Sequence, residues 1–271
     1  MPELPEVETV RRGLVQLLAG HRIDGVDWRG SKLRGLGGQP LGQMEGQRVV
    51  GVRRHGKFLL VDLSDGLWLV HLGMTGKLLF AEPGEPERKH THLVLDLDDG
   101  RQLRFSDPRR FGTLKLYGKD QAAAVPDLAH FGPDALARSF TPAVLGAELA
   151  TSRSPLKSFL LDQTRLAGVG NIYACEALWR ARLSPRRAAN TTPAGKVKPL
   201  HAAIRAVLRE SIAAGGTSFN DYVDHIGQPG KFLLELAVYD REGKPCPRCG
   251  ATIKRIQQAG RSTFHCPRCQ R

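Results

Sequence analysis

The sequence predicts an α+β protein in two parts, an N-terminal antiparallel β-sandwich with flanking helices and a helical part that ends in a four-cysteine hairpin. Three observations support this class. Short apolar runs separated by Asp-Gly pairs fill residues 48–117, helical periodicity begins near residue 154, and four paired cysteines close the chain. A chain of 271 residues can bury two cores.

The first predicted element is an N-terminal helix. Apolar side chains recur at three- and four-residue steps from Val7 to Leu17, which is one face of a helix. Acidic residues precede its basic residues, as the helix dipole favours, and Gly20 suits the end. Three acids among the first eight residues exclude a secretory signal peptide.

Pro2 and Glu3 open the chain with chemically suggestive groups. Pro2 is small enough for Met1 to be trimmed, which leaves a secondary amine. An α-amino group titrates near pH 7.7–8.0, so roughly a tenth of it is uncharged at pH 7. Such an amine attacks an electron-poor carbon, and Glu3 could transfer the proton. The alternative is that proline at this position has no chemical role.

Two β-hairpins are predicted next. Apolar runs at 57–63 and 67–72 flank one Asp-Gly pair, and runs at 92–97 and 102–105 flank another. The Pro- and Glu-rich residues 81–90 indicate a surface loop. Several short antiparallel strands favour a sandwich or barrel.

The helical part contains three predicted helices. Ser154-Pro155 starts the first, Asn171 caps the second, which runs through Leu183, and Pro193 begins the third. Residues 215–231 are glycine-rich without periodicity and are predicted as a loop. We predict four segments: 1–130, 131–152 as a linker, 153–235, and 236–271.

Positive charge concentrates in the second half of the chain. The formal charge is +13. Residues 1–150 carry 20 basic and 19 acidic residues, whereas 151–271 carry 20 and 8. This asymmetry favours a polyanion, such as nucleic acid, bound by one half. No apolar run approaches the ~18 residues that span a bilayer, so we expect a soluble protein. The basic residues form no amphipathic terminal helix, so contact with a membrane surface is not expected. The paired cysteines point to metal in a reducing compartment, and we expect a cytoplasmic protein.

Four cysteines have the spacing of a zinc site. Cys246 and Cys249 are separated from Cys266 and Cys269 by sixteen residues, which fits four thiolates around one tetrahedral ion. With four protein ligands there is no open position, so one structural zinc per chain is expected. Cys175 is expected as a small buried residue of its helix.

Two basic features accompany the zinc site. Lys254, Arg255 and Arg261 lie on the hairpin that zinc would stiffen, and Arg261 lies near its tip, where it could clamp phosphate. The alternative is a solvated basic hairpin. The turn Gly168–Asn171 opens a helix, and free amides at a helix start attract phosphate, although an ordinary helix corner has the same sequence.

Together these features resemble the formamidopyrimidine-DNA glycosylase family, bacterial enzymes that remove oxidised purines from DNA. The resemblance extends from end to end. Related enzymes for oxidised pyrimidines start Pro-Glu-Gly-Pro-Glu, so Leu4 favours the purine branch. The segments that carry the resemblance are Pro2 to Arg11, Gly56 to Leu59, His71 to Gly76, Asp107 to Gly112, Leu161 to Gln163, Gly168 to Ala174 and Arg261 to Arg271.

The resemblance implies a β-sandwich joined to a helix–two-turn–helix domain with a zinc hairpin, with duplex DNA between them. It implies that Pro2 attacks the sugar carbon and forms a Schiff base, with Glu3 as proton donor. Lys57 would assist β-elimination at the sugar-phosphate, and Arg261 would assist δ-elimination. The protein would be a bifunctional glycosylase and abasic-site lyase, acting as a monomer on 8-oxoguanine and formamidopyrimidines.

Further residues are assigned to DNA by resemblance. Met74, Arg109 and Phe111 would fill the space left by a flipped nucleotide, although core packing also explains Met74 and Phe111. Phosphate or backbone contacts are expected from His90, Arg153, Lys157 and Asn171. Glu6 is either a carboxylate beside the lesion or an ordinary acid of the first helical turn.

The sequence departs from the family pattern in two places. Asp240 stands where glycine is expected, and residues 217–231, where the family recognises the flipped base, have their own sequence. Two alternative functions remain open. One is a glycosylase for oxidised pyrimidines, and the other is a non-catalytic nucleic-acid-binding zinc protein.

Overall fold

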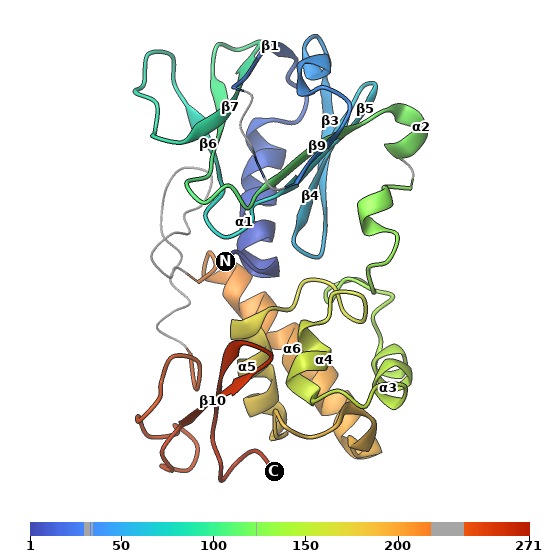
Figure 1. The fold of residues 1–271 in the computed structure, drawn as a ribbon, viewed down its shortest axis with the longest axis vertical. Helices are drawn as coiled ribbons and strands as arrows, with labels where there is room; N and C mark the ends of the chain where they lie inside the picture. Colours follow the sequence, from blue (N-terminus) through green and yellow to red (C-terminus); the bar gives the residue numbers. More distant parts are fainter. Residues whose placement is uncertain (30–32, 34, 123, 218–235) are drawn as a thin grey trace. The chain divides into compact units, whose positions relative to one another are not determined.

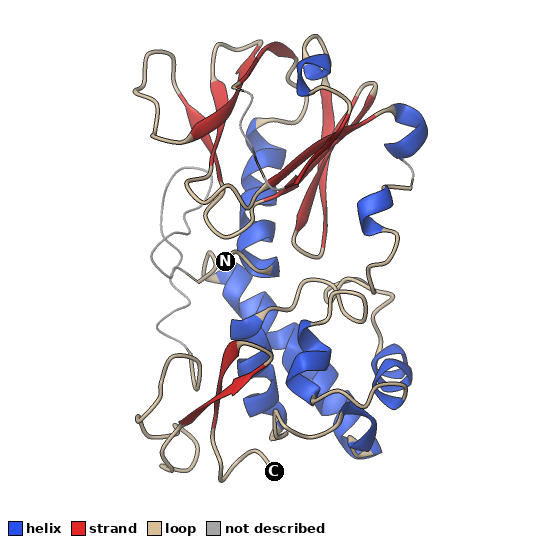
Figure 2. Ribbon diagram, viewed as in Figure 1, coloured by secondary structure: helices blue, strands red, loops and turns tan. Residues whose placement is uncertain are grey.

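The computed structural model describes residues 1–271 apart from 30–32, 34, 123 and 218–235. The described residues form two compact units, one of Met1–Ala129 with 214–217 and one of His130–Ala213 with 236–271. Strands dominate the first unit and helices the second (Figure 2). The division confirms the α+β prediction. The predicted loop at 215–231 lies almost wholly outside the described residues.

Two sheets build the first unit (Figure 1). One has the order β1-β7-β8-β6 and the other the order β2-β9-β5-β4-β3; all pairs are antiparallel except β2 with β9. Both predicted hairpins, β4–β5 and β7–β8, are present. The strands are β1 Ile23–Trp28, β2 Gly35–Gly38, β3 Val49–His55, β4 Phe58–Leu63, β5 Gly66–His71, β6 Lys77–Ala81, β7 Thr91–Leu97, β8 Gln102–Ser106 and β9 Thr113–Tyr117.

The predicted N-terminal helix is α1, Leu4–Leu17, and it packs against β3 and β4. Its apolar face, with Val7, Val10 and Leu14, joins a core that includes Trp68 from β5. Short helical segments complete the unit: η1 Leu41–Met44, α2 Lys119–Ala122 and η2 Pro126–Leu128.

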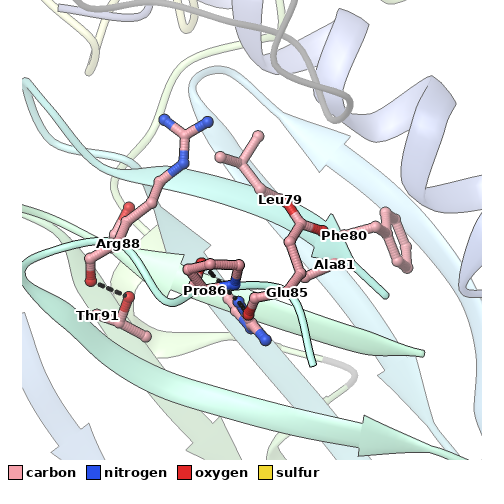
Figure 3. Close-up of a pocket in the computed structure, with 9 residues that line it drawn as sticks. Leu79, Phe80, Ala81, Glu85, Pro86, Arg88 and Thr91 are labelled. Carbon is pink, nitrogen blue, oxygen red and sulfur yellow. Dashed lines mark hydrogen bonds between the residues drawn. The ribbon is translucent and has the colours of Figure 1, made fainter. Parts of the chain in front are cut away.

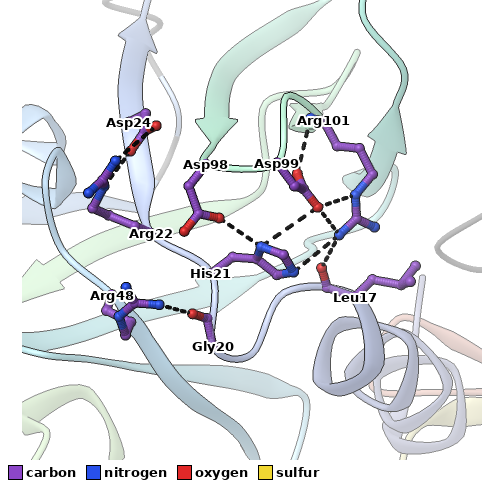
Figure 4. A network of polar contacts seen from close by, with 9 residues as sticks. All are labelled: Leu17, Gly20, His21, Arg22, Asp24, Arg48, Asp98, Asp99 and Arg101. Atoms are coloured by element: carbon purple, nitrogen blue, oxygen red, sulfur yellow. Dashed lines mark hydrogen bonds and ion pairs between the residues drawn. The ribbon is translucent and has the colours of Figure 1, made fainter.

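A polar network holds the C-terminal end of α1 to the β7–β8 turn (Figure 4). His21 Nδ1 lies 2.8 Å from Asp98 Oδ1, and Arg101 Nη2 donates to the carbonyl of Leu17 at 3.0 Å. Asp99 pairs with Arg101, which lowers the pKa of Asp99. The C-terminal end of the helix is therefore fixed by polar contacts.

The second unit is helical, with α3 Pro142–Ala150, α4 Leu156–Leu161, α5 Asn171–Ala181, η3 Ala189–Thr191 and α6 Ala194–Ala213. Helix α6 packs on α5 and α3, so much of the stretch predicted as a linker lies inside this unit. The N-cap of α5 is Gly170, not Asn171 as predicted, and the helix ends before Arg182, whose backbone is left-handed.

The chain ends in a hairpin of β10 Lys254–Gln258 and β11 Arg261–His265. Its turn is 259–260, so Arg261 is the first residue of the returning strand. Cys175, buried as predicted, joins Val238, Phe264 and Cys266 in the core beneath the hairpin. Within the described residues, no helix is both long and apolar enough to cross a membrane.

Candidate functional site

The predicted nucleophile lies at the buried start of α1. Pro2 and Glu3 are both buried, whereas Met1 is exposed. Glu6 Oε2 accepts the Glu3 amide N–H at 2.8 Å in a capping box, and Glu6 Oε1 accepts the amide N–H of Thr217 at 2.8 Å. One carboxylate thus holds the peptide that follows Pro2 and also the residue from which the glycine-rich segment continues.

Lys57 occupies the turn between β3 and β4, where its side chain is 6% exposed. Arg54 fixes this turn, because its guanidinium donates to the Gly56 carbonyl at 2.9 Å and to Glu8 of α1 at 3.0 Å. Burial raises the pKa of Glu8, but hydrogen bonds from Arg11 and Arg54 outweigh it and lower that pKa. Glu8 therefore ties the lysine turn to the helix that carries Pro2.

His71, at the end of β5, is a neutral partner of Lys57. Burial and the positive charge of Lys57 lower the pKa of His71 to about 4. Its Nδ1 lies 3.1 Å from the Gly73 amide and so accepts that hydrogen bond, and its ring lies 4.8 Å from Phe58. No role for His71 was predicted from the sequence. Its place near Lys57 depends on strand pairing, which puts His71 opposite Phe58, the residue after Lys57.

Two loops of the first unit present the predicted gap-filling side chains. Arg109 and Phe111 are exposed, and the Arg109 guanidinium stacks 4.9 Å from the Phe111 ring. Met74 is half-buried on the other loop. Gly73 has φ +61°, and a Cβ there would lie 2.5 Å from the Phe111 carbonyl carbon, so glycine is needed for the loops to meet.

Asp107 organises both loops from inside. It is fully buried, accepts the Gly112 amide at 2.8 Å and the Arg109 amide at 3.3 Å, and is hydrogen-bonded to the hydroxyl of Thr75. No role for Asp107 itself was predicted from the sequence, beyond its place in the segment Asp107 to Gly112. Its function as an acceptor for three donors follows from the tertiary structure.

His90 lies on the exposed loop after β6, at φ +65°. A pocket of about 70 Å³ lies under this loop. Figure 3 shows the side chains that line it. Arg104 of β8 donates to the carbonyl of Glu85 at 2.9 Å, and the Thr91 hydroxyl donates to the Arg88 carbonyl at 2.8 Å. These bonds attach the loop to the sheet. His90 is the exposed last residue of the loop, directly before β7.

In the second unit, Lys157 is fully buried, although it was predicted to contact phosphate. Its ammonium donates to the Ser262 carbonyl at 2.9 Å and to the Thr263 hydroxyl at 2.7 Å. Asn171 Nδ2 donates to the same Ser262 carbonyl at 3.0 Å. Both side chains therefore hold the strand that begins with the exposed Arg261.

Arg153 is exposed just before α4. Farther along, Glu176 of α5 is buried, and its carboxylate accepts the amides of Ala237, Val238 and Tyr239 at 2.9–3.0 Å. Burial raises the pKa of Glu176, which the three donors partly offset. Asp240 follows at φ +58°, a conformation that suits the expected glycine and that Asp also tolerates.

The four predicted cysteines meet at one point. Their sulfur atoms all lie within 4.8 Å of one another, with Cys246–Cys269 at 4.0 Å and Cys249–Cys266 at 3.5 Å. A tetrahedral zinc with bonds of about 2.3 Å needs sulfur atoms roughly 3.8 Å apart. The four thiols therefore fit one zinc ion, as the spacing predicted.

Comparison with known families identifies the chain. Models for the formamidopyrimidine-DNA glycosylase N-terminal domain and H2TH domain match residues 1–114 and 131–223, and the zinc finger found in FPG and IleRS matches 243–271. The chain belongs to the formamidopyrimidine-DNA glycosylase family. This confirms the resemblance, the fold class and the zinc site predicted from the sequence.

Relatives match this family member over its whole length. A formamidopyrimidine-DNA glycosylase of Heliobacterium modesticaldum is 46% identical, with all of both chains covered. Two solved structures of the Lactococcus lactis Fpg are 36% identical over all of both chains. One is bound to DNA with an abasic site, with a TM-score of 0.91, and one is a variant bound to DNA containing Fapy-dG, with a TM-score of 0.92.

Proposed function

We propose that this protein is a base-excision-repair enzyme that removes oxidised purines, including 8-oxoguanine and formamidopyrimidines, from duplex DNA and then cleaves the abasic site. Family membership over the full length supports the activity, and the relative solved in complex with DNA that contains Fapy-dG supports the lesion class. The observation that carries the assignment is that Pro2 and Glu3 are buried before the first turn of α1, where Glu6 holds the Glu3 amide. The proposed location is the cytoplasm, on chromosomal DNA.

The proposed reaction begins with Pro2 after loss of Met1. The amine donates its electron pair to the sugar carbon C1′, the bond to the damaged base breaks, and the base leaves with a proton. Opening of the sugar ring gives a Schiff base between Pro2 and C1′. Glu3 is the proposed proton carrier to the ring oxygen. While Met1 is attached, the Pro2 nitrogen is an amide and has no electron pair to give.

Lys57 is proposed to bind the sugar-phosphate next to the Schiff base. A neutral His71 beside it suits this role, because an uncharged imidazole adds no second cation that would repel the ammonium. Elimination of the 3′ and then the 5′ phosphate would leave a one-nucleotide gap. Arg261 is the proposed cation at the second phosphate.

Base removal requires the nucleotide to leave the stack. Met74 and Phe111 are the proposed apolar inserts, and Arg109 is the proposed partner of the widowed base. Their support is that the two loops meet around Gly73 and share Asp107. His90, Arg153 and Asn171 remain proposed backbone contacts. For Lys157 we propose instead that it positions the hairpin, since its ammonium is buried against Ser262.

Zinc is structural in this scheme. It would be held by Cys246, Cys249, Cys266 and Cys269 and would keep the ends of the hairpin together, so that Arg261 projects from a stiff strand. It takes no part in bond breaking.

Side-by-side excision assays test this function. We expect single-turnover release of 8-oxoguanine and Fapy-dG from duplexes to exceed release of oxidised pyrimidines, followed by a one-nucleotide gap. Faster release of oxidised pyrimidines would favour the sister activity. Binding of damaged DNA with no base release by protein lacking Met1 would favour a non-catalytic DNA-binding protein.

A further inference from the structure

Helix α5 touches the zinc site through a side chain outside the four ligands. The indole N–H of Trp179 donates to Cys246 Sγ at 3.4 Å. Trp179 is half-buried near the end of the helix, and Cys246 is 3% exposed. A zinc ion with four thiolates carries two net negative charges, and a thiolate that is removed from water needs donors in place of water.

Arg248 fixes the indole from the other side. Its guanidinium carbon lies 4.1 Å from the centre of the Trp179 ring, and its Nη1 donates to the Trp179 carbonyl at 2.9 Å. Arg248 belongs to the Cys246–Cys249 turn itself. A cation over the ring draws electron density from the indole and strengthens its N–H as a donor. The Cys246–Cys249 turn thus holds Trp179 through Arg248, and Trp179 in turn donates a hydrogen bond to Cys246.

The four sulfur atoms differ in their surroundings. Cys266 is also fully buried and accepts the backbone amide of Cys269 at 3.3 Å. Cys249 and Cys269 are half-exposed and line a surface cavity of about 450 Å³. The remaining lining of that cavity consists of Arg182, Arg248, Arg268 and Arg271. Arginine side chains therefore surround the more exposed Cys249 and Cys269, whereas the buried Cys246 accepts the hydrogen bond of the Trp179 indole.

We propose that Trp179, held by Arg248, is a positioning residue of the zinc centre that slows zinc loss and couples α5 to the metal. The backbone amides of Arg248 and Cys249 also face Cys246, so the indole adds to these donors. Trp179 lies near the C-terminal end of α5. The first residue of this helix is Asn171, whose side chain is hydrogen-bonded to Ser262 of the hairpin. Helix α5 therefore contacts this region at two points, Cys246 through Trp179 and Ser262 through Asn171, and loss of the indole bond would remove the first.

The test is the rate at which zinc-loaded protein yields its metal to a chromogenic chelator. Trp179→Phe keeps a ring but removes the N–H, and we expect zinc release to become about ten-fold faster, as for other groups that support metal ligands. Trp28→Phe, the same change at a half-buried tryptophan of β1, should release zinc at the parental rate. Arg248→Gln should give an intermediate rate. A parental rate in Trp179→Phe overturns the proposal.

A measurement without substitution covers the case in which Trp179→Phe fails to fold. In protein loaded with cadmium-113, a hydrogen bond from the indole to a metal-bound sulfur transmits scalar coupling between the indole proton and the metal. We expect a splitting of the Trp179 indole signal and none for Trp28. A Trp179 signal with no coupling overturns the proposal.

Discussion

Asp107 in the first unit and Lys157 in the second are both fully buried charged side chains, and each holds residues that are proposed to touch DNA. Asp107 accepts hydrogen bonds from the loops of Met74, Arg109 and Phe111. Lys157 donates to the strand that begins with Arg261. The loops thus depend on an acceptor within one core, whereas the hairpin depends on a donor, a second helix and a metal.

Because of this difference, the hairpin and the first unit can lose their structure independently. A carboxylate that serves three donors is satisfied by the chain itself, because buried charges are stable when hydrogen bonds replace water. The hairpin has a small core of its own and needs four ligands brought together. The first unit should therefore keep its fold under conditions that release the hairpin.

Removal of zinc should have the largest effect and would separate the two regions. Chelation by a strong competitor should weaken binding to abasic-site duplex by at least about a hundred-fold, because metal binding is coupled to the folding of such hairpins. The spectrum of the β-rich unit should be unchanged. Fluorescence anisotropy measures binding to the duplex, and circular dichroism measures the spectrum of the β-rich unit. Unfolding of both units on zinc removal would show that the first unit also depends on zinc, contrary to this expectation.

Asp107→Ala should damage the first region alone. The Gly112 amide and the Thr75 hydroxyl would lose their buried acceptor, while the Arg109 amide would keep only the Thr75 hydroxyl. We expect a loss of about 3 kcal/mol in the free energy of unfolding of this unit. Urea titration measures it, and Asp120→Ala, an exposed acid of α2, serves as control. Zinc content should not change. A variant as stable as the parent would contradict the role given to Asp107.

Lys157→Met should affect the position of the hairpin more than its stability. Thr263 loses its donor, while Asn171 still holds Ser262, so we expect a loss below about 2 kcal/mol. A small displacement of Arg261 should reduce the second elimination roughly ten-fold while the first is kept. Gel analysis of the two cleavage products measures this. The half-exposed Lys196 provides the control Lys196→Met, and equal loss of both products would point to direct phosphate contact instead.

The last expected effect depends on pH and concerns His71. Its folded-state pKa of about 4 lies below the unfolded value near 6.5. Above pH 6.5 the imidazole is neutral in both states and costs nothing. As the pH falls toward 4, only the unfolded chain takes up the proton, so stability falls by up to about 1.4 kcal/mol per pH unit. His71→Asn should lose this part of the acid sensitivity in urea titrations at pH 7 and 5. His130→Asn, at an exposed histidine, should retain it.

Local sequence patterns predicted most of the fold. The Asp-Gly hairpins, the N-terminal helix and the four-cysteine site follow from spacing along the chain, and all are present. The N-cap of α5 was wrong because the side chain of Asn171 is used by Ser262, ninety-one residues away. The pairing of Arg54 with Glu8 and the burial of Lys157 depend on similarly distant partners. No local period records such contacts.

In the proposed reaction the Pro2 amine, freed of Met1, attacks the sugar. The most direct measurement is borohydride reduction during reaction with damaged duplex, followed by protease digestion and mass spectrometry of the adduct. We expect the nucleotide fragment to be attached to a peptide beginning at Pro2, and protein with an alanine placed ahead of Pro2 to form no adduct. An adduct on Lys57, or on chains that still carry Met1, would contradict it.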